Sequence, residues 1–285
     1  MKLIKKVNIL IVGLGLLGGS YAKGLKKLGF IVNAITKDSS SVDFALINGI
    51  IDYGTTEIEP EIIGKADLVV FALYPHTFKE WVKENQQYFK SGAILTDVTG
   101  VKGCVVDEIQ SVLRSDVEYI AAHPMAGKEV CGVENADDAI FKGANYIVVP
   151  TEKNTAEAIE LCCNLGELLG FKQVAILSVA EHDKMIAFLS QLTHCIAVSL
   201  MCSNDTPGLE AYTGDSFRDL TRIARINDEM WSELFLSNKE DLLCEMEKFK
   251  VAFNELYDKI KNNDRDGMRR MMQLSTERRK LFDKK

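Results

Sequence analysis

The chain has 285 residues, which is long for one hydrophobic core and comfortable for two domains. A formal net charge of -7 repels phosphate backbones, so we expect no nucleic acid partner. The 47% share of hydrophobic residues is typical of a soluble globular protein, and no uninterrupted apolar run reaches about 18 residues, so we also expect no membrane span.

The first part of the chain alternates short apolar runs with amphipathic stretches. The apolar runs predict strands at 7–12, 31–35, 68–73, 94–95, 119–122, 146–149 and 174–177. Stretches with apolar residues at helical spacing predict helices at 16–28, 40–48, 77–88 and 156–169. Strands that alternate with helices are typical of a Rossmann-like α/β domain with a mostly parallel sheet.

The pattern changes after residue 177. Apolar residues at helical spacing predict a long helix over 178–201, another over 228–261 and a last helix near the end of the chain. We therefore expect a dinucleotide-binding domain over 1–177 and an all-helical substrate and dimerisation domain over 178–285. Apolar faces on several of these helices predict a homodimer.

A glycine-rich segment follows the first predicted strand. The run from Gly13 to Gly18 reads GLGLLG and fits the pattern G-x-G-x-x-G, between a strand and a helix. In that pattern the first glycine permits a tight turn, the second admits a pyrophosphate and the third lets helix and strand pack closely. Free N–H groups at the start of the helix would then face the phosphates. The segment predicts a cofactor site formed by Gly13, Gly15, Leu16, Leu17 and Gly18.

The residues after the second strand bear on the choice of cofactor. An acid at the end of this strand would bind the 2′-hydroxyl of NAD, but the expected position holds Thr36, followed by Lys37. A hydroxyl and a cation suit the 2′-phosphate of NADP better than a carboxylate would. Asp38 would serve NAD if the strand ran longer, and Lys37 could equally be a solvated charge. We therefore expect NAD or NADP.

Two of the four histidines and one arginine are candidates for chemistry. His123 ends a predicted strand, where a neutral imidazole could accept a hydroxyl proton as hydride leaves the same carbon. His194 lies on the long helix, four residues after Ser190 and on the same face. Of three arginines on the next helix, apolar neighbours favour Arg222 as the one that points inward to grip a carboxylate. Satisfied core histidines and a solvated arginine face are the structural alternatives.

Several segments together resemble a known family. They are GLGLLGGS at 13–20, HPMAG at 123–127 with Glu129, EHD at 181–183, SQLTH at 190–194 and FRDLTRIA at 217–224 with Trp231. In this order, and over nearly the whole chain, they resemble the prephenate dehydrogenase family.

The resemblance implies an NAD(P)-dependent enzyme of tyrosine biosynthesis. It would oxidise and decarboxylate prephenate, a dicarboxylate, to 4-hydroxyphenylpyruvate. By this resemblance His123 takes the hydroxyl proton, and His194 is a second catalytic histidine that lines the substrate pocket. Arg222 would bind a substrate carboxylate, while Ser190 and Glu129 would shape the pocket.

Two segments depart from the family pattern. The serine that would hydrogen-bond the catalytic histidine is Gly100 here, and Thr99, one position earlier, is the candidate replacement in the substrate site. The family motif Ser-His-Leu-Pro-His is degraded to Ser190-Gln191-Leu192-Thr193-His194 in this chain, with Gln191 and Thr193 in place of its second and fourth residues. Both changes leave the choice of substrate open.

Other functions remain as alternatives. Arogenate dehydrogenase differs only in an amine for a ketone on the substrate side chain, and the sequence does not decide between the two substrates. A β-hydroxyacid dehydrogenase would use a lysine of the helical domain, for which Lys184 is available. A non-catalytic NADP-sensing module would bind the cofactor without turnover.

The seven cysteines include no C-x-x-C pair and no histidine at zinc spacing. We therefore expect reduced thiols, no metal site and a cytoplasmic location. Since the chain ends soon after the helical domain, we expect no separate regulatory module, and any feedback by tyrosine would act at the active site.

Overall fold

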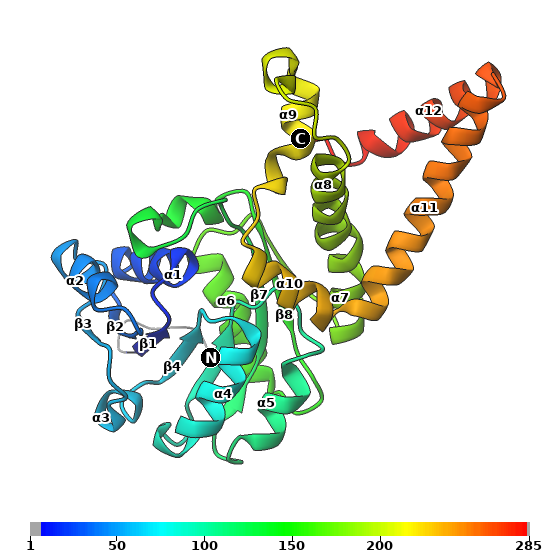
Figure 1. The fold of residues 1–285 in the computed structure, drawn as a ribbon. Helices are drawn as coiled ribbons and strands as arrows, with labels where there is room; N and C mark the ends of the chain where they lie inside the picture. The colour runs from blue at the N-terminus through cyan, green and yellow to red at the C-terminus, as the bar shows by residue number, and fades with distance from the viewer. Residues whose placement is uncertain (1–6, 284–285) are drawn as a thin grey trace. The chain divides into compact units, whose positions relative to one another are not determined.

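The computed structural model describes residues 7–283 and divides the chain into two compact units (Figure 1). The larger unit ends at Asn238, and the smaller begins at Lys239.

Six parallel strands form the main sheet of the larger unit, in the order β3-β2-β1-β4-β5-β6. They are β1 (Asn8–Val12), β2 (Ile31–Ile35), β3 (Tyr53–Thr55), β4 (Leu68–Phe71), β5 (Ile94–Asp97) and β6 (Glu118–Tyr119). The order is that of a Rossmann fold, and its direction reverses between β1 and β4. Ligands of open parallel sheets bind at this switch point, outside the carboxyl ends of the strands.

Alternate residues of the central strands enter two separate cores. On β1, Ile9 and Ile11 belong to one buried cluster, whereas Leu10 and Val12 belong to the other. The first cluster includes apolar residues of α1 (Leu16–Lys27) and the second those of α4 (Pro75–Asn85). Helices on both faces account for the uninterrupted apolar sequence of these strands. The remaining helices of this domain's first part are α2 (Ser39–Ile47), α3 (Pro60–Ile63) and α5 (Val106–Val112).

A second, three-stranded sheet follows the first. It contains β7 (Ala121–Met125), β8 (Asn145–Val149) and β9 (Gln173–Ile176), with α6 (Ala156–Leu168) between the last two. The sequence predicted one strand over 119–122, but the chain leaves the first sheet after Tyr119 and enters the second at Ala121. His123 therefore lies in the middle of an antiparallel pair, opposite Ile147, and not at the end of a parallel strand.

The predicted helix over 178–201 is one continuous helical segment with an irregular centre. It comprises α7 (Val179–Ile186), a π-helical turn over Ala187–Leu192 and α8 (Thr193–Cys202). By length and composition alone this segment could cross a membrane, although polar and charged residues interrupt its apolar sequence. Core helices of soluble proteins pass the same test. Only 28% of its apolar window is buried within the chain, so much of this surface is available to a partner.

The larger unit ends with α9 (Asp215–Thr221), a short 3-10 turn over Arg222–Ala224 and α10 (Asp228–Ser237). The sequence predicted a single helix over 228–261, and this is wrong at Asn238. That residue leaves the helical conformation, and its side-chain amide donates to the carbonyl of Asp183 and to Oε1 of Gln191, both at 2.8–2.9 Å. These tertiary bonds compensate for the interrupted helix.

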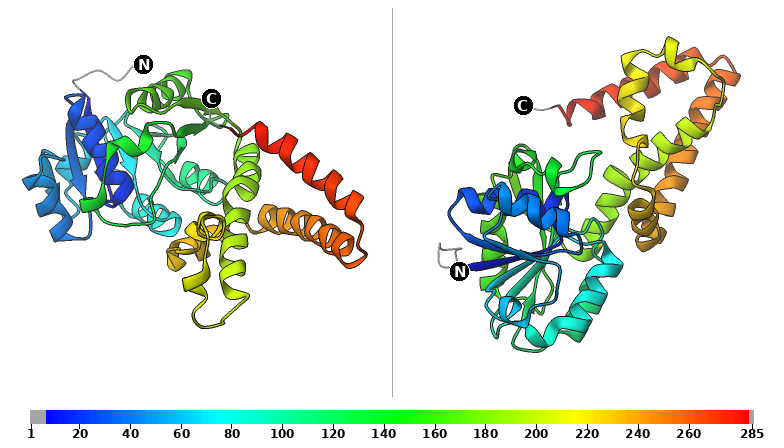
Figure 2. Two further views of the ribbon diagram at one scale, coloured as in Figure 1. Left: turned by 90° about the horizontal axis from the view of Figure 1, so that it is seen from above. Right: turned by 60° about the vertical axis from the view of Figure 1, so that its left-hand side comes forward.

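The smaller unit contains α11 (Lys239–Lys261) and α12 (Arg265–Lys280). The two helices meet at a tight turn in which Asn263 has a left-handed φ of 55° (Figure 2). Asp264 caps α12 by accepting a hydrogen bond from the backbone N–H of Gly267.

Candidate active site

The glycine-rich segment forms the turn between β1 and α1 (Figure 1). Gly13 has a left-handed φ of 98°, and a Cβ there would lie 2.5 Å from the carbonyl oxygen of Ala72. A Cβ on Gly18 would lie 1.9 Å from the carbonyl oxygen of Gly13, whereas one on Gly15 would meet no atom within 4 Å. Packing within the chain therefore requires glycine at 13 and 18. At position 15 only an external group would require it.

The start of α1 offers unpaired donors to such a group. Gly15 is the N-cap residue and supplies no side-chain hydrogen bond, and Leu16 and Leu17 begin the first turn. The N–H groups of a first helical turn have no partner within the helix, and they carry the positive end of its dipole. This end of α1, at the switch point of the sheet, fits the pyrophosphate of a dinucleotide.

The segment after β2 is ordered by hydrogen bonds. The hydroxyl of Thr36 accepts a bond of 3.3 Å from the backbone N–H of Leu14, which ties it to the glycine turn. Asp38 caps α2, and its carboxylate accepts bonds from the backbone and hydroxyl groups of Ser40 and Ser41. These bonds lower the pKa of Asp38. Because β2 ends at Ile35, Asp38 belongs to the next helix, while Lys37 is exposed beside the turn.

His123 takes part in a chain of two hydrogen bonds. Its Nδ1 lies 2.8 Å from Nε2 of His182, and Nδ1 of His182 lies 2.6 Å from Oδ1 of Asp183. His182 and Asp183 are placed by the first turns of α7, which begins with a capping box between Ser178 and Glu181. The sequence supplied these two residues only as part of a family motif. An adjacent His-Asp pair at a helix start was the available signal.

Both histidines are held in the neutral state. Burial lowers the pKa of His123 well below its ordinary 6.5, and electrostatic interactions with His182 and Lys102 act in the same direction. Burial also lowers the pKa of His182, against the opposing effect of Asp183. A neutral imidazole is the form that can accept a proton.

The carboxylate of Asp183 is fixed in its ionised form. Burial by itself would raise its pKa, but hydrogen bonds from His182 and from the backbone N–H groups of Gly103 and Lys102 outweigh this effect and lower it. The loop after β5 and the start of α7 are thereby joined.

A buried polar cluster lies beneath His123. The ammonium group of Lys102, with no exposed surface, is 2.7 Å from Oδ2 of Asp97 and donates to the carbonyl of Ala122 at 2.5 Å. The hydroxyl of Tyr119 donates to Oδ1 of Asp97 at 2.9 Å. The cluster fixes the backbone immediately before His123.

Thr99 belongs to this cluster and not to an open pocket. It is 4% exposed, and its hydroxyl bonds to the carboxylate of Asp97 and to the carbonyl of Val101. The expectation that Thr99 replaces the family serine as the partner of His123 is therefore wrong. His182 makes that contact.

His194 stacks on an aromatic ring. Its centroid is 3.7 Å from that of Trp231, with 28° between the planes, and its Nδ1 donates to the backbone carbonyl of Ser190 at 2.8 Å. This bond leaves Nε2 as an acceptor. Burial lowers the pKa of His194, so this ring too is neutral near pH 7.

Arg222 and Glu129 form an ion pair between the 3-10 turn after α9 and the loop after β7. The expectation that Arg222 points inward is wrong within this chain, because 64% of its side chain is exposed. Its apolar neighbours Ile223 and Ala224 are themselves only partly buried. The structure thus brings together two of the predicted site residues, and leaves the guanidinium accessible.

Gln191, one of the departures from the family motif, is buried. Its Nε2 donates to the carbonyl of Leu234 at 2.8 Å, and its Oε1 accepts from Asn238. It therefore fastens α10 to the π-helical turn that also carries Ser190. Lys184, which a β-hydroxyacid dehydrogenase would use, is exposed on α7.

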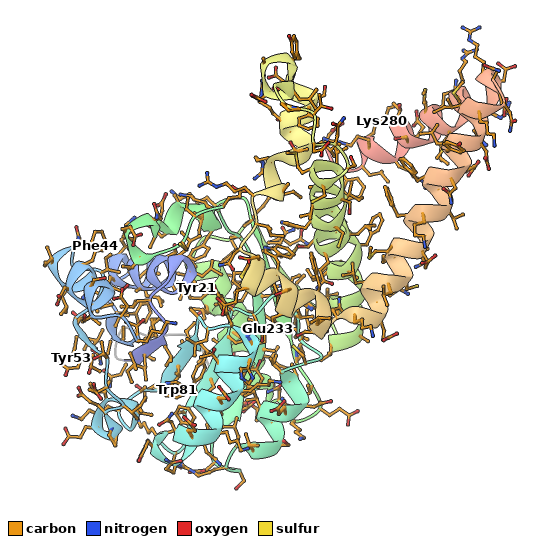
Figure 3. All side chains as sticks on the ribbon, viewed as in Figure 1. Tyr21, Phe44, Tyr53, Trp81, Glu233 and Lys280 are labelled. Atoms are coloured by element: carbon orange, nitrogen blue, oxygen red, sulfur yellow. The ribbon has the colours of Figure 1, made fainter. Side chains whose placement is uncertain are left out.

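α10 is also bonded to the first turn of α4 and to Tyr74, the residue just before that helix. Oε1 of Glu233, a residue of α10 labelled in Figure 3, accepts from the backbone N–H of His76 at 2.7 Å. Asn227 donates to the hydroxyl of Tyr74 at 3.0 Å. This part of the chain follows β4, the strand beside the glycine turn. These bonds tie α10, which carries Trp231, to the chain that follows the carboxyl end of β4.

A glycine turn at the switch point of a Rossmann sheet, with a neutral histidine on a strand of the second sheet, is typical of a dinucleotide-dependent oxidoreductase. The sequence model of "Prephenate dehydrogenase, nucleotide-binding domain" matches residues 21–175, and that of "Prephenate dehydrogenase, dimerization domain" matches residues 178–274. The chain belongs to the prephenate dehydrogenase family. The glycine turn precedes the first matched range, so its assignment rests on the geometry above.

Individual relatives agree with this membership. Prephenate dehydrogenase of Lactococcus lactis is 31% identical over 90% of this chain and 72% of its own length, and that of Bacillus subtilis is 28% identical over 92% and 72%. A crystal structure of prephenate dehydrogenase from A. aeolicus, in complex with hydroxyphenyl propionate and NAD+, is 30% identical. It superimposes with a TM-score of 0.91 over 99% of this chain and 100% of its own.

Proposed function

We propose that this chain catalyses the oxidative decarboxylation of prephenate to 4-hydroxyphenylpyruvate with reduction of NAD or NADP, a step of tyrosine biosynthesis. The observation that carries the proposal is the neutral His123, whose Nδ1 is engaged by His182 and whose Nε2 is left for a substrate. The glycine turn that fits a dinucleotide, and the NAD+ bound to the A. aeolicus relative, support the cofactor.

The reaction needs one base and correct orientation. Bound NAD(P) supplies the hydride acceptor. His123 takes the proton of the ring hydroxyl at Nε2 as hydride leaves the same carbon. Carbon dioxide then departs from the opposite ring carbon, and the electrons of that bond complete the aromatic ring. Because aromatisation provides the driving force, the protein mainly orients a dianionic substrate against the cofactor.

We assign the substrate contacts to the residues around His194. Nε2 of His194, whose ring stacks on Trp231, is available as an acceptor. The exposed guanidinium of Arg222 is suited to bind a substrate carboxylate in place of Glu129. Ser190 and Glu129 border the same region. Thr99 is left out because its hydroxyl is buried in the Asp97 cluster.

We further propose a functional division into residues 1–177 and 178–285, supported by the two matched family ranges. The second of these is described as a dimerisation domain, which supports a homodimer. All seven cysteines are free thiols, which supports a reducing, cytoplasmic location.

A four-way assay tests the proposal. Purified protein is given prephenate or arogenate, each with NAD and with NADP, and the formation of reduced cofactor is followed by absorbance. We expect turnover with prephenate. Turnover with arogenate alone would show that arogenate, and not prephenate, is the substrate. Cofactor binding without turnover in all four reactions would contradict an enzymatic function and favour a sensing module.

Replacing the base tests its role. His123→Asn should lower kcat by roughly 10²–10⁴-fold, because general base catalysis contributes about that much. Cofactor affinity, measured by fluorescence titration, should be unchanged. His76→Asn is the matched control, because His76 is exposed and lies on α4. Near-normal turnover of His123→Asn would remove His123 from the mechanism.

A further inference from the structure

The side chains behind His123 form a directed chain that the reaction as described does not use. His182 has no exposed surface, and it bridges His123 and Asp183 through bonds of 2.8 and 2.6 Å. We propose that His182, held by Asp183, is a positioning residue that fixes the tautomer and the orientation of His123. This inference rests on the proposed role of His123 as the base.

The direction of the chain follows from what Asp183 is able to do. Its carboxylate accepts bonds from the backbone N–H groups of Lys102 and Gly103 at 2.9 and 2.7 Å, and it has no proton to donate. Nδ1 of His182 must therefore carry the proton of the 2.6 Å bond, which leaves Nε2 of His182 as an acceptor. Nδ1 of His123 then donates to that nitrogen, and Nε2 of His123 holds the free electron pair.

The surroundings keep His182 from acting as a base itself. Its side chain has no exposed surface, and the charged groups that face it are Asp183 on its own helix and Asp97 and Lys102 from β5 and the loop that follows. The ammonium of Lys102 opposes a second positive charge on either imidazole. His182 is thus suited to orient the ring of His123 by a hydrogen bond, and not to accept the proton that His123 takes from the substrate.

Thr99 and Gly100, in the loop after β5, do not hydrogen-bond Nδ1 of His123. Thr99 is committed to Asp97, and a Cβ on Gly100 would lie 3.6 Å from a methyl group of Leu234 on α10. Position 100 therefore faces an apolar side chain. Within residues 7–283, Nδ1 of His123 is bonded to Nε2 of His182.

A tautomer measurement tests the proposal without relying on turnover. With histidine labelled by 15N, the four imidazoles are resolved by NMR at about pH 8, where neutral rings are expected. His123→Asn and His182→Leu assign their signals. We expect His123 to be protonated at Nδ1 in the native protein and to lose this preference in His182→Leu. Protonation at Nε2 in the native protein, or no change in the variant, would overturn the proposal.

Kinetics of two matched variants give the second test. His182→Gln keeps an acceptor at a reach similar to that of Nε2, whereas His182→Leu removes it. We expect His182→Leu to lower kcat by roughly tenfold or more with KM unchanged, and His182→Gln to recover most of the loss. Thermal melting shows whether each variant is folded. Equal losses in the two folded variants would indicate a packing role and contradict the proposal.

The two hypotheses fail differently. If the native protein turns over neither prephenate nor arogenate, the proposed function is lost, while the tautomer of His123 still decides whether His182 positions it. If native turnover is normal and both His182 variants retain it, only the positioning role is lost.

Discussion

The chemistry of His123 depends on its neighbours more than on its own sequence segment. The ordinary imidazole titrates near pH 6.5, but burial, His182 and Lys102 hold the pKa of His123 well below this value. The polar cluster around Asp97 fixes the backbone before it, and α7 supplies the partner of its ring. A strand residue is in this way held neutral and oriented, as the proposed base must be.

The lowered pKa predicts how activity depends on pH. The neutral form of His123 is the active one, so kcat/KM should be maintained as the pH falls below 6.5 and should decline only near the lowered pKa. The profile of kcat/KM at saturating cofactor measures this limb. An acid limb centred at or above 6.5 would contradict the assignment.

The same shifts predict that acid weakens the fold. His123 and His182 are neutral when folded but titrate near their ordinary pKa of 6.5 when unfolded, so the unfolded chain binds protons first as the pH falls. The free energy of unfolding attributable to them should be fully present above 6.5 and be lost below it, until the folded pKa is passed. Urea titrations between pH 5 and 8 check this, with His123→Asn expected to flatten the slope.

Arg222 carries the prediction for substrate binding. Because its guanidinium is exposed and paired only across the surface with Glu129, Arg222→Ala should leave stability nearly unchanged. It should raise KM for prephenate roughly 10- to 100-fold, with a smaller effect on kcat. Arg218→Ala is the control, since Arg218 is an exposed arginine that pairs with Asp215 on its own helix. An unchanged KM in Arg222→Ala would argue against carboxylate binding.

At the scale of elements, the turn between β1 and α1 contains one glycine that folding requires and another that only cofactor binding would require. Gly18 is required by the backbone of Gly13, while Gly15 faces open space. The two positions look alike in the sequence, and the structure shows that they have different physical reasons to be glycine.

Two alanine variants make that difference measurable. Gly15→Ala should melt like the native protein but bind NAD(P) at least roughly tenfold more weakly, because its Cβ would meet the cofactor. Gly18→Ala should lower the melting temperature, because its Cβ overlaps the carbonyl of Gly13. Fluorescence titration and differential scanning calorimetry distinguish the two effects. Native cofactor affinity in Gly15→Ala would place the cofactor elsewhere.

At the scale of the whole molecule, the helical part leaves much apolar surface uncovered. In α11 and α12 the side chains that are at least half exposed include Val251, Phe253, Tyr257, Ile260, Met272 and Leu274. Patches of this kind on a folded protein mark interaction surfaces. The match to a dimerisation domain supports a second copy of the chain as the partner.

Assembly can be measured directly. Light scattering at micromolar concentration should give twice the chain mass of 31.8 kDa. Phe253→Glu should shift the protein toward a monomer, because a buried charge opposes association, whereas Lys250→Ala should not. A native monomer under these conditions would exclude the homodimer.

The sequence by itself determined the Rossmann-like class of the fold, because buried parallel strands must be apolar throughout and G-x-G-x-x-G must follow the first of them. It also determined the family, through motifs whose order along the chain is specific. Local patterns of this kind depend on residues close together in sequence, so they can be read without coordinates.

Only the tertiary structure decided what surrounds His123. The partner His182 is 59 residues away in sequence, and no periodicity relates a strand of the second sheet to the first turns of α7. The break at Asn238, the burial of Thr99 and the exposure of Arg222 have the same cause. Each depends on contacts between distant segments, and such contacts outweigh local propensity wherever a polar group must find a partner.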